Sequence, residues 1–331
     1  MSLKAIAKEL GLSVTTVSRA LNGYFDVSSE TRARVEAEAQ RRGYRPNTLA
    51  RRLKMGKIDA VGLVFPVHPV PLNNSVFMEM VGEISHELAR HEIDLLLIAD
   101  DDLADKHSYM RMVQSRRVDA LIVAHTLDND PRLEQLQAAG FPFLALGRSH
   151  LPEPYAWFDF DNYAGTHTAA QRLIARGHQR IAYLGESHNQ AFITQRRQGY
   201  LAALKEAGLS SEWLRTMPPS RRAGYTTTQE LLALDVPPTA IVTDCNTHGD
   251  GAAMALAQMG RLTGEHAVSL VVYDGLPQDS IVDIDVAAVI QSTRQGVGKQ
   301  IADMVLQLIN GGELSQLQVL WQPEFSPGQT A

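Results

Sequence analysis

Apolar residues recur at helical spacing near the start of the chain. Leu3, Ile6, Ala7 and Leu10 share one face of a predicted short helix. Gly11 follows at once, where the end of a helix favours a residue that tolerates positive φ. A helix over residues 3–10, closed by this glycine, is therefore expected.

A second and a third helix follow at short intervals. Ser13 is a good N-cap for a helix in which Val17 and Leu21 lie one turn apart and face inward. Either Ser28 or Ser29 can cap the third helix. Two short helices joined by a tight turn that contains glycine are typical of a helix-turn-helix.

From residue 58 the pattern changes to short apolar runs that alternate with amphipathic helical stretches. Such runs predict doubly wound parallel sheets covered by helices, and two series of runs predict two lobes. A ligand would then bind between the lobes, where strands end at their carboxyl side. The first series is AVGLVFP (60–66), DLLLIAD (94–100), DALIVAH (119–125) and FPFLALG (141–147); the second is RIAYLG (180–185), TAIVTD (239–244) and AVSLVVYDG (267–275).

Charge divides the chain at the same place as the apolar pattern. The 331 residues carry a formal net charge of −6, yet residues 1–57 hold 12 Lys and Arg against 5 Asp and Glu. A basic head on an acidic body suggests a polyanion partner, with a solvated helical surface as the alternative.

The single cysteine, Cys245, excludes an internal disulfide and is consistent with a location in the reducing cytoplasm. No leader pattern and no apolar run of membrane-spanning length are found, so no membrane partner is expected.

Short polar side chains gather on the outer side of the predicted second helix. Thr15, Thr16, Ser18 and Arg19 point away from Val17. Such side chains let a helix lie deep in the major groove, where hydroxyls and arginine contact bases or phosphates. The alternative is an ordinary three-helix bundle with a hydroxyl-rich surface. Position, charge and turn chemistry together favour DNA binding.

These residues resemble the head of the LacI/GalR (lactose-repressor) family of bacterial transcription factors. The matching strings are SVTTVSRALNG (13–23), SSETRARVEAEAQRRGYRPN (28–47) and ARRL (50–53). The resemblance implies that Val14, Thr15 and Thr16 hold base-reading positions. It also assigns DNA contacts or their support to Ser13, Ser18, Arg19 and Asn22.

Residues 46–57 form a predicted tether. Pro46 blocks continuation of the third helix, and Asn47 can cap a short helix that would be unstable alone in water. The resemblance implies a hinge helix that forms on DNA and inserts Leu53, with Ala50 beside it, into the minor groove. Asn47, Arg51, Arg52 and Lys54 would lie at or near the phosphates. The alternative is a disordered basic linker.

The body resembles the effector domain of the same family, which shares the fold of periplasmic sugar-binding proteins. The strings GHQRIAYLG (177–185), DNYAG (161–165) and VVYDG (271–275) carry this resemblance. It implies a cleft that binds a small molecule, with paired hydroxyls on carboxylate or guanidinium groups and a sugar face on aromatic rings. The implied effector-binding residues are Phe77, Arg148, Phe160, Asp161, Arg196, Tyr225, Asn246, Asp274 and Gln291.

The chain departs from the family pattern at several of these places. Cys245 and Asn246 stand where the family often has Asn-Asp, and the segment VHPVPLNNS (67–75) is longer and richer in proline than usual. Arg148 can either bind ligand or pair with an acidic neighbour. The identity of the effector therefore does not transfer from the resemblance.

The sequence as a whole predicts a cytoplasmic, homodimeric repressor of an α/β class with a helix-turn-helix head. We expect a DNA-binding domain over 1–45, a hinge over 46–57 and an effector and dimerisation domain over 58–331. The lobes of that domain are expected at about 58–158 with 289–320, and about 159–288 with 321–331. The predicted partners are a pseudo-palindromic DNA operator and a small molecule, favoured to be a sugar. A purine or a phosphorylated metabolite is the alternative effector, and a solute-binding protein without DNA function is the alternative class.

Enzymatic chemistry is not expected. The histidines of HELARHE (86–92) are five apart, whereas the zinc pattern needs four, and TRQGVGKQ (293–300) lacks the first glycine and the hydroxyl of a P-loop. ADDDLAD (99–105) fits a strand end followed by a helix cap. We therefore predict no catalytic residue, no cofactor and no metal.

Overall fold

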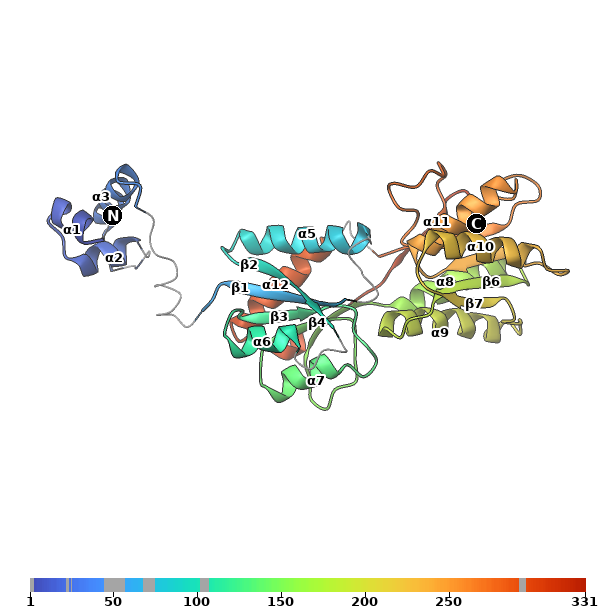
Figure 1. The fold of residues 1–331 in the computed structure, drawn as a ribbon, viewed down its shortest axis with the longest axis horizontal. Coiled ribbons are helices and arrows are strands. Elements are labelled where there is room, and N and C mark those ends of the chain that lie inside the picture. The colour runs from blue at the N-terminus through green and yellow to red at the C-terminus, as the bar shows by residue number, and fades with distance from the viewer. Residues whose placement is uncertain are drawn as a thin grey trace. The chain divides into compact units, whose positions relative to one another are not determined.

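The computed structural model describes residues 3–21, 24, 26–44, 57–67, 75–101, 107–291 and 296–331. The chain divides into two compact units, residues 1–58 and residues 59–331. The smaller unit is helical in its described part, and the larger holds two sheets with helices on both faces (Figure 1). The predicted fold class is confirmed.

Capping residues set the ends of the helices in the smaller unit. Gly11 has φ 66°, and this left-handed turn ends the first helix. Ser13 caps the second helix by accepting the N–H of Thr16 at 2.9 Å. Of the two candidates for the third cap, Ser28 is the one used, since its Oγ accepts the N–H of Thr31. The helices are α1 (Leu3–Leu10), α2 (Val14–Leu21) and α3 (Ser29–Arg41).

A small apolar core holds these three helices together. Val17 and Val35 are fully buried, whereas Leu21, predicted as an anchor, is only partly buried. Ala20 takes the more central place, because it follows Val17 by three residues on the same side of α2. The buried residues of this core are Ile6, Ala7, Val17, Ala20, Val27, Val35 and Ala39.

The first sheet of the larger unit has the strand order β11-β5-β4-β3-β1-β2, and all its pairings are parallel. Helices α5 and α12 pack on one face, while α6 and α7 lie on the other (Figure 1). The strands are β1 (Ala60–Pro66), β2 (Asp94–Asp100), β3 (Ala120–Val123), β4 (Phe143–Leu146), β5 (Ala156–Phe160) and β11 (Gln318–Trp321). The helices are α5 (Ser75–Ala89), α6 (Ser108–Gln114), α7 (Pro131–Ala138), α12 (Val297–Ile309) and the 3-10 turn η3 (Leu314–Gln316).

The second sheet has the order β12-β10-β9-β8-β6-β7, with only β12 antiparallel. Helices α8 and α9 cover one face, and α10 and α11 cover the other. The strands are β6 (Ile181–Glu186), β7 (Leu214–Met217), β8 (Ala240–Thr243), β9 (Ser269–Tyr273), β10 (Ala287–Ile290) and β12 (Glu324–Ser326). The helices are α8 (Asn162–Ala175), α9 (Ala191–Glu206), α10 (Arg221–Leu232) and α11 (Asn246–Gln258).

The chain passes between the two lobes three times. It crosses after β5, after β10 and again between β11 and β12. Sheet membership places these crossings slightly later than the expected boundaries of 159 and 289. Asp159 and Phe160 still belong to β5 of the first sheet, and Val289 and Ile290 pair within the second.

Glycines bring the covering helices of the second lobe into backbone contact. A Cβ on Gly199 of α9 would clash with the carbonyl of Tyr163 on α8 and lie 2.7 Å from Thr166 Oγ1. Gly251 of α11 likewise lies against α10, where a Cβ would come within 2.6 Å of the Tyr225 nitrogen. Helix packing this close leaves no room for any side chain.

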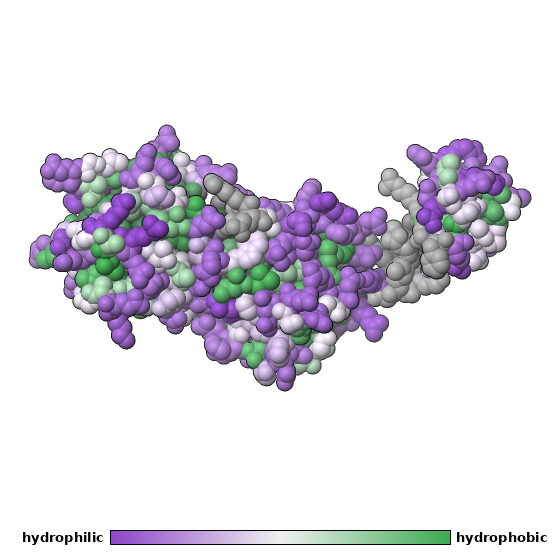
Figure 2. All heavy atoms as spheres, turned by 180° about the vertical axis from the view of Figure 1, so that it is seen from behind, coloured by the Kyte–Doolittle hydropathy of each residue, from purple (hydrophilic) through white to green (hydrophobic). Residues whose placement is uncertain are grey.

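The described helices include none that is both long and apolar enough to cross a membrane. On the face drawn in Figure 2, apolar side chains form patches separated by hydrophilic ones. Isolated exposed apolar residues such as Leu97 and Ile281 are normal on a protein surface.

Candidate functional site

The outer face of α2 presents the short polar side chains that the sequence singled out. Val14 is 41% exposed, and Thr15 is also exposed. The Thr16 hydroxyl bonds to Ser13 Oγ at 2.8 Å, so both side chains support the start of the helix. The first turn of α2 therefore carries an exposed Val-Thr pair.

Arg19 lies on the same helix and is held by its neighbours. Its Nε donates to Asp26 Oδ1 at 3.1 Å, a second guanidinium nitrogen pairs with the same carboxylate, and the guanidinium carbon lies 5.1 Å from the centre of the Tyr24 ring. This side chain is therefore oriented before any ligand binds. Ser18 is partly buried and has a contact of its own. The remaining predicted DNA-contacting residues lie outside the described part of the chain: Asn22, Asn47, Ala50, Arg51, Arg52, Leu53 and Lys54.

Further basic residues are fixed at the end of α3. Arg41 and Arg42 both bond to the Glu38 carboxylate, which lowers the pKa of Glu38 to about 2. Arg42 also donates to Glu9 of α1 at 2.8 Å. This network ties α3 to α1 and keeps Glu38 ionised.

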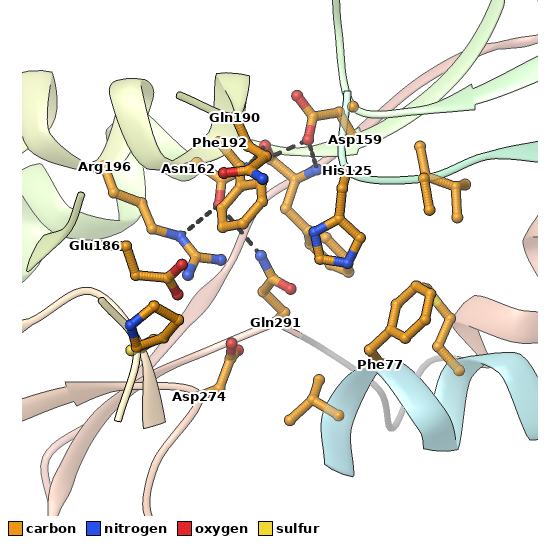
Figure 3. Close-up of a pocket in the computed structure, with 18 of the residues that line it drawn as sticks. Phe77, His125, Asp159, Asn162, Glu186, Gln190, Phe192, Arg196, Asp274 and Gln291 are labelled. Atoms are coloured by element: carbon orange, nitrogen blue, oxygen red, sulfur yellow. Dashed lines mark hydrogen bonds between the residues drawn. The ribbon is translucent and has the colours of Figure 1, made fainter. Parts of the chain in front are cut away.

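A cavity of about 420 Å³ lies between the two lobes, at the carboxyl ends of strands from both sheets (Figure 3). The first lobe lines it with residues from 76 to 160 and with Val297 of α12. The second lobe contributes residues from 162 to 291. Its size falls in the range of small-molecule binding sites.

Asn162 is the centre of a hydrogen-bond network in this cavity. Its Oδ1 accepts from Arg196 Nε at 2.9 Å, from the Tyr273 hydroxyl at 3.2 Å and from Gln291 Nε2 at 3.2 Å. Its Nδ2 donates to Asp159 Oδ1 at 3.3 Å. One side chain at the start of α8 thus orients groups from four other segments (Figure 3).

Arg196 is clamped from both sides. Its Nη1 donates to the carbonyl of Asp244 at 2.6 Å, and its guanidinium carbon lies 3.5 Å from the centre of the Tyr273 ring and 4.9 Å from that of Phe192. Stacking and hydrogen bonding leave the guanidinium one fixed orientation along the cavity wall. This is the arrangement expected of a side chain that binds a ligand without reorganising.

Carboxylates share the cavity with that single guanidinium. Asp274 follows β9 with φ 66°, and burial raises its pKa although Arg196 opposes the shift. Burial also raises the pKa of Asp159 to about 6, despite its bond to Arg148 Nε at 2.9 Å. Glu186 lines the same end of the cavity. The wall is therefore rich in acceptors for hydroxyl groups.

Aromatic rings line the other end. His125 follows β3 with φ 53°, and its ring centre lies 5.1 Å from that of Phe77 and 5.9 Å from that of Phe192. Burial, together with the charges of Arg132 and Arg196, lowers the pKa of His125 to about 4. His125 is therefore neutral near pH 7 and presents an uncharged ring to the cavity.

Five of the predicted effector-binding residues meet at this cavity. They are Phe77, Phe160, Arg196, Asp274 and Gln291. They come from five separate elements or strand ends, as the expected ligand site between the lobes requires.

The other four lie elsewhere, each for an identifiable reason. Arg148 is outside the described cavity lining and pairs with Asp159, in keeping with the second of the two roles left open for it. Asp161 is the N-cap of α8 and accepts the N–H of Ala164 at 3.0 Å. An aspartate that directly precedes a helix is often used in this way.

Tyr225 and Asn246 are also absent from the described cavity lining. Tyr225 is part of α10 and donates its hydroxyl to Gln258 of α11 at 2.6 Å. Asn246 is buried at the start of α11, where its Oδ1 accepts the Thr247 hydroxyl at 3.2 Å. Its neighbours Cys245 and Thr247 line the cavity in its place.

Several lining residues were missed by the sequence reasoning. Asn162 stands inside the DNYAG string, and His125 and Glu186 come at or just after the ends of predicted strands. The rule that ligands bind at the carboxyl ends of parallel strands could have indicated these three residues. Gln190 and Phe192 lie at the start of α9, and no local signal marks them.

One buried cluster in the described residues resembles a metal-ligand set. The ligand atoms of Asp244, Cys245 and His248 lie within 4.8 Å of one another. His248 Nδ1 is 3.5 Å from Asp244 Oδ1; burial lowers the pKa of His248, but this carboxylate outweighs burial and raises it. Burial raises the pKa of the Cys245 thiol well above its usual range. Burial therefore disfavours the thiolate through which a cysteine binds a metal.

Two sequence profiles decide the family. The one described as bacterial regulatory proteins, lacI family, matches residues 2–47. The one described as periplasmic binding proteins and sugar binding domain of LacI family matches residues 58–325. The chain belongs to the LacI family. As a LacI-family protein with a helix-turn-helix head, it is a DNA-binding transcription regulator.

Individual LacI-family relatives extend over nearly the whole chain. It is 64% identical over 330 residues to the HTH-type transcriptional regulator RafR of Escherichia coli, which covers 100% of this chain and 98% of RafR. A putative transcriptional regulator from Yersinia pestis has a crystal structure with 52% identity and a TM-score of 0.79, covering 83% of this chain and 98% of that one. The CelR–cellobiose complex has 25% identity and a TM-score of 0.71, with both chains fully covered.

Proposed function

We propose that this regulator is a repressor whose operator affinity is set by a sugar bound in the cavity between the lobes. The observation that carries the proposal is the donor and acceptor set of the cavity. Asp274, Glu186, Asn162, Gln291 and Arg196 offer acceptors and donors for paired hydroxyls, and aromatic rings face them. A related regulator of this family binds cellobiose, which supports a sugar here as well.

Charge separates this proposal from a phosphorylated or purine nucleotide effector. Arg196 is the one Arg or Lys among the described lining residues. The Glu186 and Asp274 carboxyl groups share the cavity with it, while the third lining carboxyl group, Asp159, is paired with Arg148 outside the lining. A phosphate would meet more negative than positive charge, and uncompensated charge in a buried site is costly. A neutral polyhydroxylated ligand avoids this penalty.

The DNA-binding parts are assigned by the same proposal. Residues 1–45 form the operator-reading head, with Val14, Thr15 and Arg19 on its recognition helix. Residues 46–57 form the hinge, in which Leu53 inserts into the minor groove beside Ala50. Residues 58–331 bind the effector and dimerise, so that two heads read a pseudo-palindrome in the cytoplasm. The protein catalyses no reaction in this scheme.

Sugar binding and DNA binding are coupled through the hinge. A sugar that binds one arrangement of the lobes more tightly changes the fraction of dimers whose hinge helices can form on DNA. This change in population alters operator affinity. The coupling is reciprocal, so operator DNA must change sugar affinity by the same factor.

Selection from a random duplex pool tests the DNA function. We expect a pseudo-palindrome, with binding that weakens steeply as salt rises. Leu53→Ala should weaken binding to the selected operator far more than binding to a scrambled duplex. Enrichment of no sequence at any salt would overturn the regulator proposal, and equal losses on both duplexes would overturn the role of Leu53.

Fluorescence anisotropy on the selected operator then tests the effector. A panel of neutral sugars, sugar phosphates and purines is titrated into the complex. We expect a neutral sugar to change operator affinity, and Asp274→Asn to abolish the change while operator binding stays intact. Asparagine tolerates the left-handed backbone of this position. A response to phosphorylated ligands alone would contradict the proposal.

A further inference from the structure

The cavity has two chemically different ends. Arg196, Glu186 and Asp274 lie together at one end, and Phe77 lies across the cavity from them (Figure 3). The lining around Phe77 is apolar and comes from the first lobe, with Val76, Met80 and Phe158. A ligand that fills the whole cavity must therefore be polar at one end and offer a ring face at the other.

The polar end is already bonded within the protein. Arg196 uses Nε and Nη1 for Asn162 and Asp244, and Gln291 donates to Asn162. These bonds hold the side chains in place for a ligand.

Two buried atoms have no hydrogen-bond partner in the described part of the chain: His125 Nε2, in the ring that lies against Phe77, and Gln190 Oε1. Both residues line the cavity. A third such atom, His188 Nδ1, lies 3.5 Å from the Glu186 carboxylate and belongs to the polar end. Because buried polar atoms nearly always find a partner, unpaired atoms on a cavity wall indicate where ligand groups bind.

The backbone fixes His125 and Gln190 next to each other across the two lobes. Leu127 of the first lobe forms an antiparallel bridge with Gln190 of the second, and the N–H of Ala191 donates to the carbonyl of Thr126 at 2.8 Å. His125 directly precedes this bridge and lies between the rings of Phe77 and Phe192. The two unpaired atoms are therefore set by backbone pairing and ring packing.

We propose that His125 and Gln190 determine specificity for a saccharide of at least two units. The first unit occupies the end with Arg196 and Asp274. The second unit lies against Phe77 and Phe192, and its hydroxyls bond to His125 Nε2 and Gln190 Oε1. This inference rests on the proposed sugar effector, and it names oligosaccharides, not monosaccharides, as the ligand class.

Isothermal titration calorimetry on the full chain tests the proposal. The panel contains glucose, galactose and fructose, then sucrose, lactose, maltose, melibiose, trehalose and cellobiose, then raffinose and maltotriose. We expect at least one saccharide of two or three units to bind tenfold or more tightly than every monosaccharide. A monosaccharide that binds as tightly as the best longer sugar would overturn the inference but leave the sugar effector in place.

Variants test the two named residues. His125→Asn keeps a residue that tolerates positive φ and removes the ring, and Gln190→Met keeps length and removes the unpaired oxygen. Each should weaken binding of the best oligosaccharide about tenfold and change monosaccharide binding less than twofold. His266→Asn, at an exposed position outside the cavity lining, is the matched control and should change neither.

The outcomes distinguish failure of this inference from failure of the proposed sugar effector. Equal loss of short and long sugars in His125→Asn and Gln190→Met would overturn the assignment of these residues to a second unit. Oligosaccharide binding that neither variant weakens would overturn it too. Failure of the unaltered protein to bind any sugar would instead overturn the sugar effector itself.

Discussion

The contact between α8 and α9 gives a prediction whose size follows from the structure. A Cβ on Gly199 would lie 2.7 Å from Thr166 Oγ1 and still closer to the Tyr163 carbonyl, whereas ordinary contacts begin near 3.4 Å. Gly199→Ala therefore forces the two helices apart. The neighbouring bond from Thr166 Oγ1 to the carbonyl of Arg196, at 2.6 Å, cannot survive that separation.

The expected loss of stability is about 2 kcal/mol. Overpacking typically costs about 1–3 kcal/mol and the lost hydrogen bond about 1 kcal/mol, while alanine regains about 1 kcal/mol through its higher helix propensity. Ligand affinity should fall as well, because α9 carries Arg196 and α8 carries Asn162, whose 2.9 Å bond would stretch. We expect about a tenfold loss, which corresponds to about 1.4 kcal/mol.

Urea unfolding followed by tryptophan fluorescence measures the stability change. All three tryptophans, Trp157, Trp213 and Trp321, belong to the larger unit, so the signal reports on the affected part. Gly82→Ala is the matched control: Gly82 lies in α5 with open space where a Cβ would stand, and alanine should stabilise by about 0.5–1 kcal/mol. If Gly199→Ala were as stable as the unaltered chain, the backbone contact would not be as close as described.

Three further changes test other parts of the molecule. Ser28→Ala should speed amide hydrogen exchange in α3 about fivefold, because an N-cap contributes about 1 kcal/mol. Ser29→Ala is the control and should not change the exchange rate. Equal effects of the two substitutions would contradict the assignment of Ser28 as the cap. Because the pKa of His125 is about 4 when folded and 6.5 ordinarily, the unfolded chain binds more protons between these values, so stability present at neutral pH is lost as pH falls. Between neutral pH and pH 5, the free energy of unfolding of the unaltered chain should fall by about 2 kcal/mol through His125, and His125→Asn should not show this fall in urea unfolding. An identical pH profile for the two proteins would refute the neutral buried ring. Asp26→Asn should free Arg19 to contact any phosphate. We expect a lower ratio of operator affinity to scrambled-duplex affinity and a steeper salt dependence of scrambled-duplex binding. An unchanged ratio in anisotropy titrations would show that Asp26 does not position Arg19.

Local signals carried the sequence-based prediction of the head. Helix caps and turns are decided within a few residues, so the roles of Gly11 and Ser13 follow from the residues next to them. The choice between Ser28 and Ser29 does not, because both have the same chemistry and only backbone geometry separates them. The alternating apolar runs predicted both sheets in the same way.

Long-range packing limited the prediction of the cavity. Arg196 was found because a string of residues marks it, but its partner Asn162 is 34 positions away, and no residue beside Asn162 indicates that contact. Tyr225 was expected in the cavity, whereas its hydroxyl bonds to Gln258 in the structure, because a helix position does not reveal which neighbour its outer face meets. Gln190 reaches the cavity only through its bridge to Leu127, a pairing between lobes that no local pattern encodes.

The three crossings between the lobes have a consequence for how the protein is made. The edge strand β11 pairs with β5 across about 160 residues of intervening chain, and α12 supplies Ile301 and Val305 to the core of the first lobe. A ribosome therefore releases most of this lobe while the part of the sheet face that α12 covers is exposed and the edge at β5 is open. The second lobe is nearly continuous in sequence, and when α12 and β11 are made it lacks only the edge strand β12 and the last few residues. The first lobe, which is synthesised earlier, must wait for α12 and β11, and in that interval its open sheet edge can pair with a wrong partner.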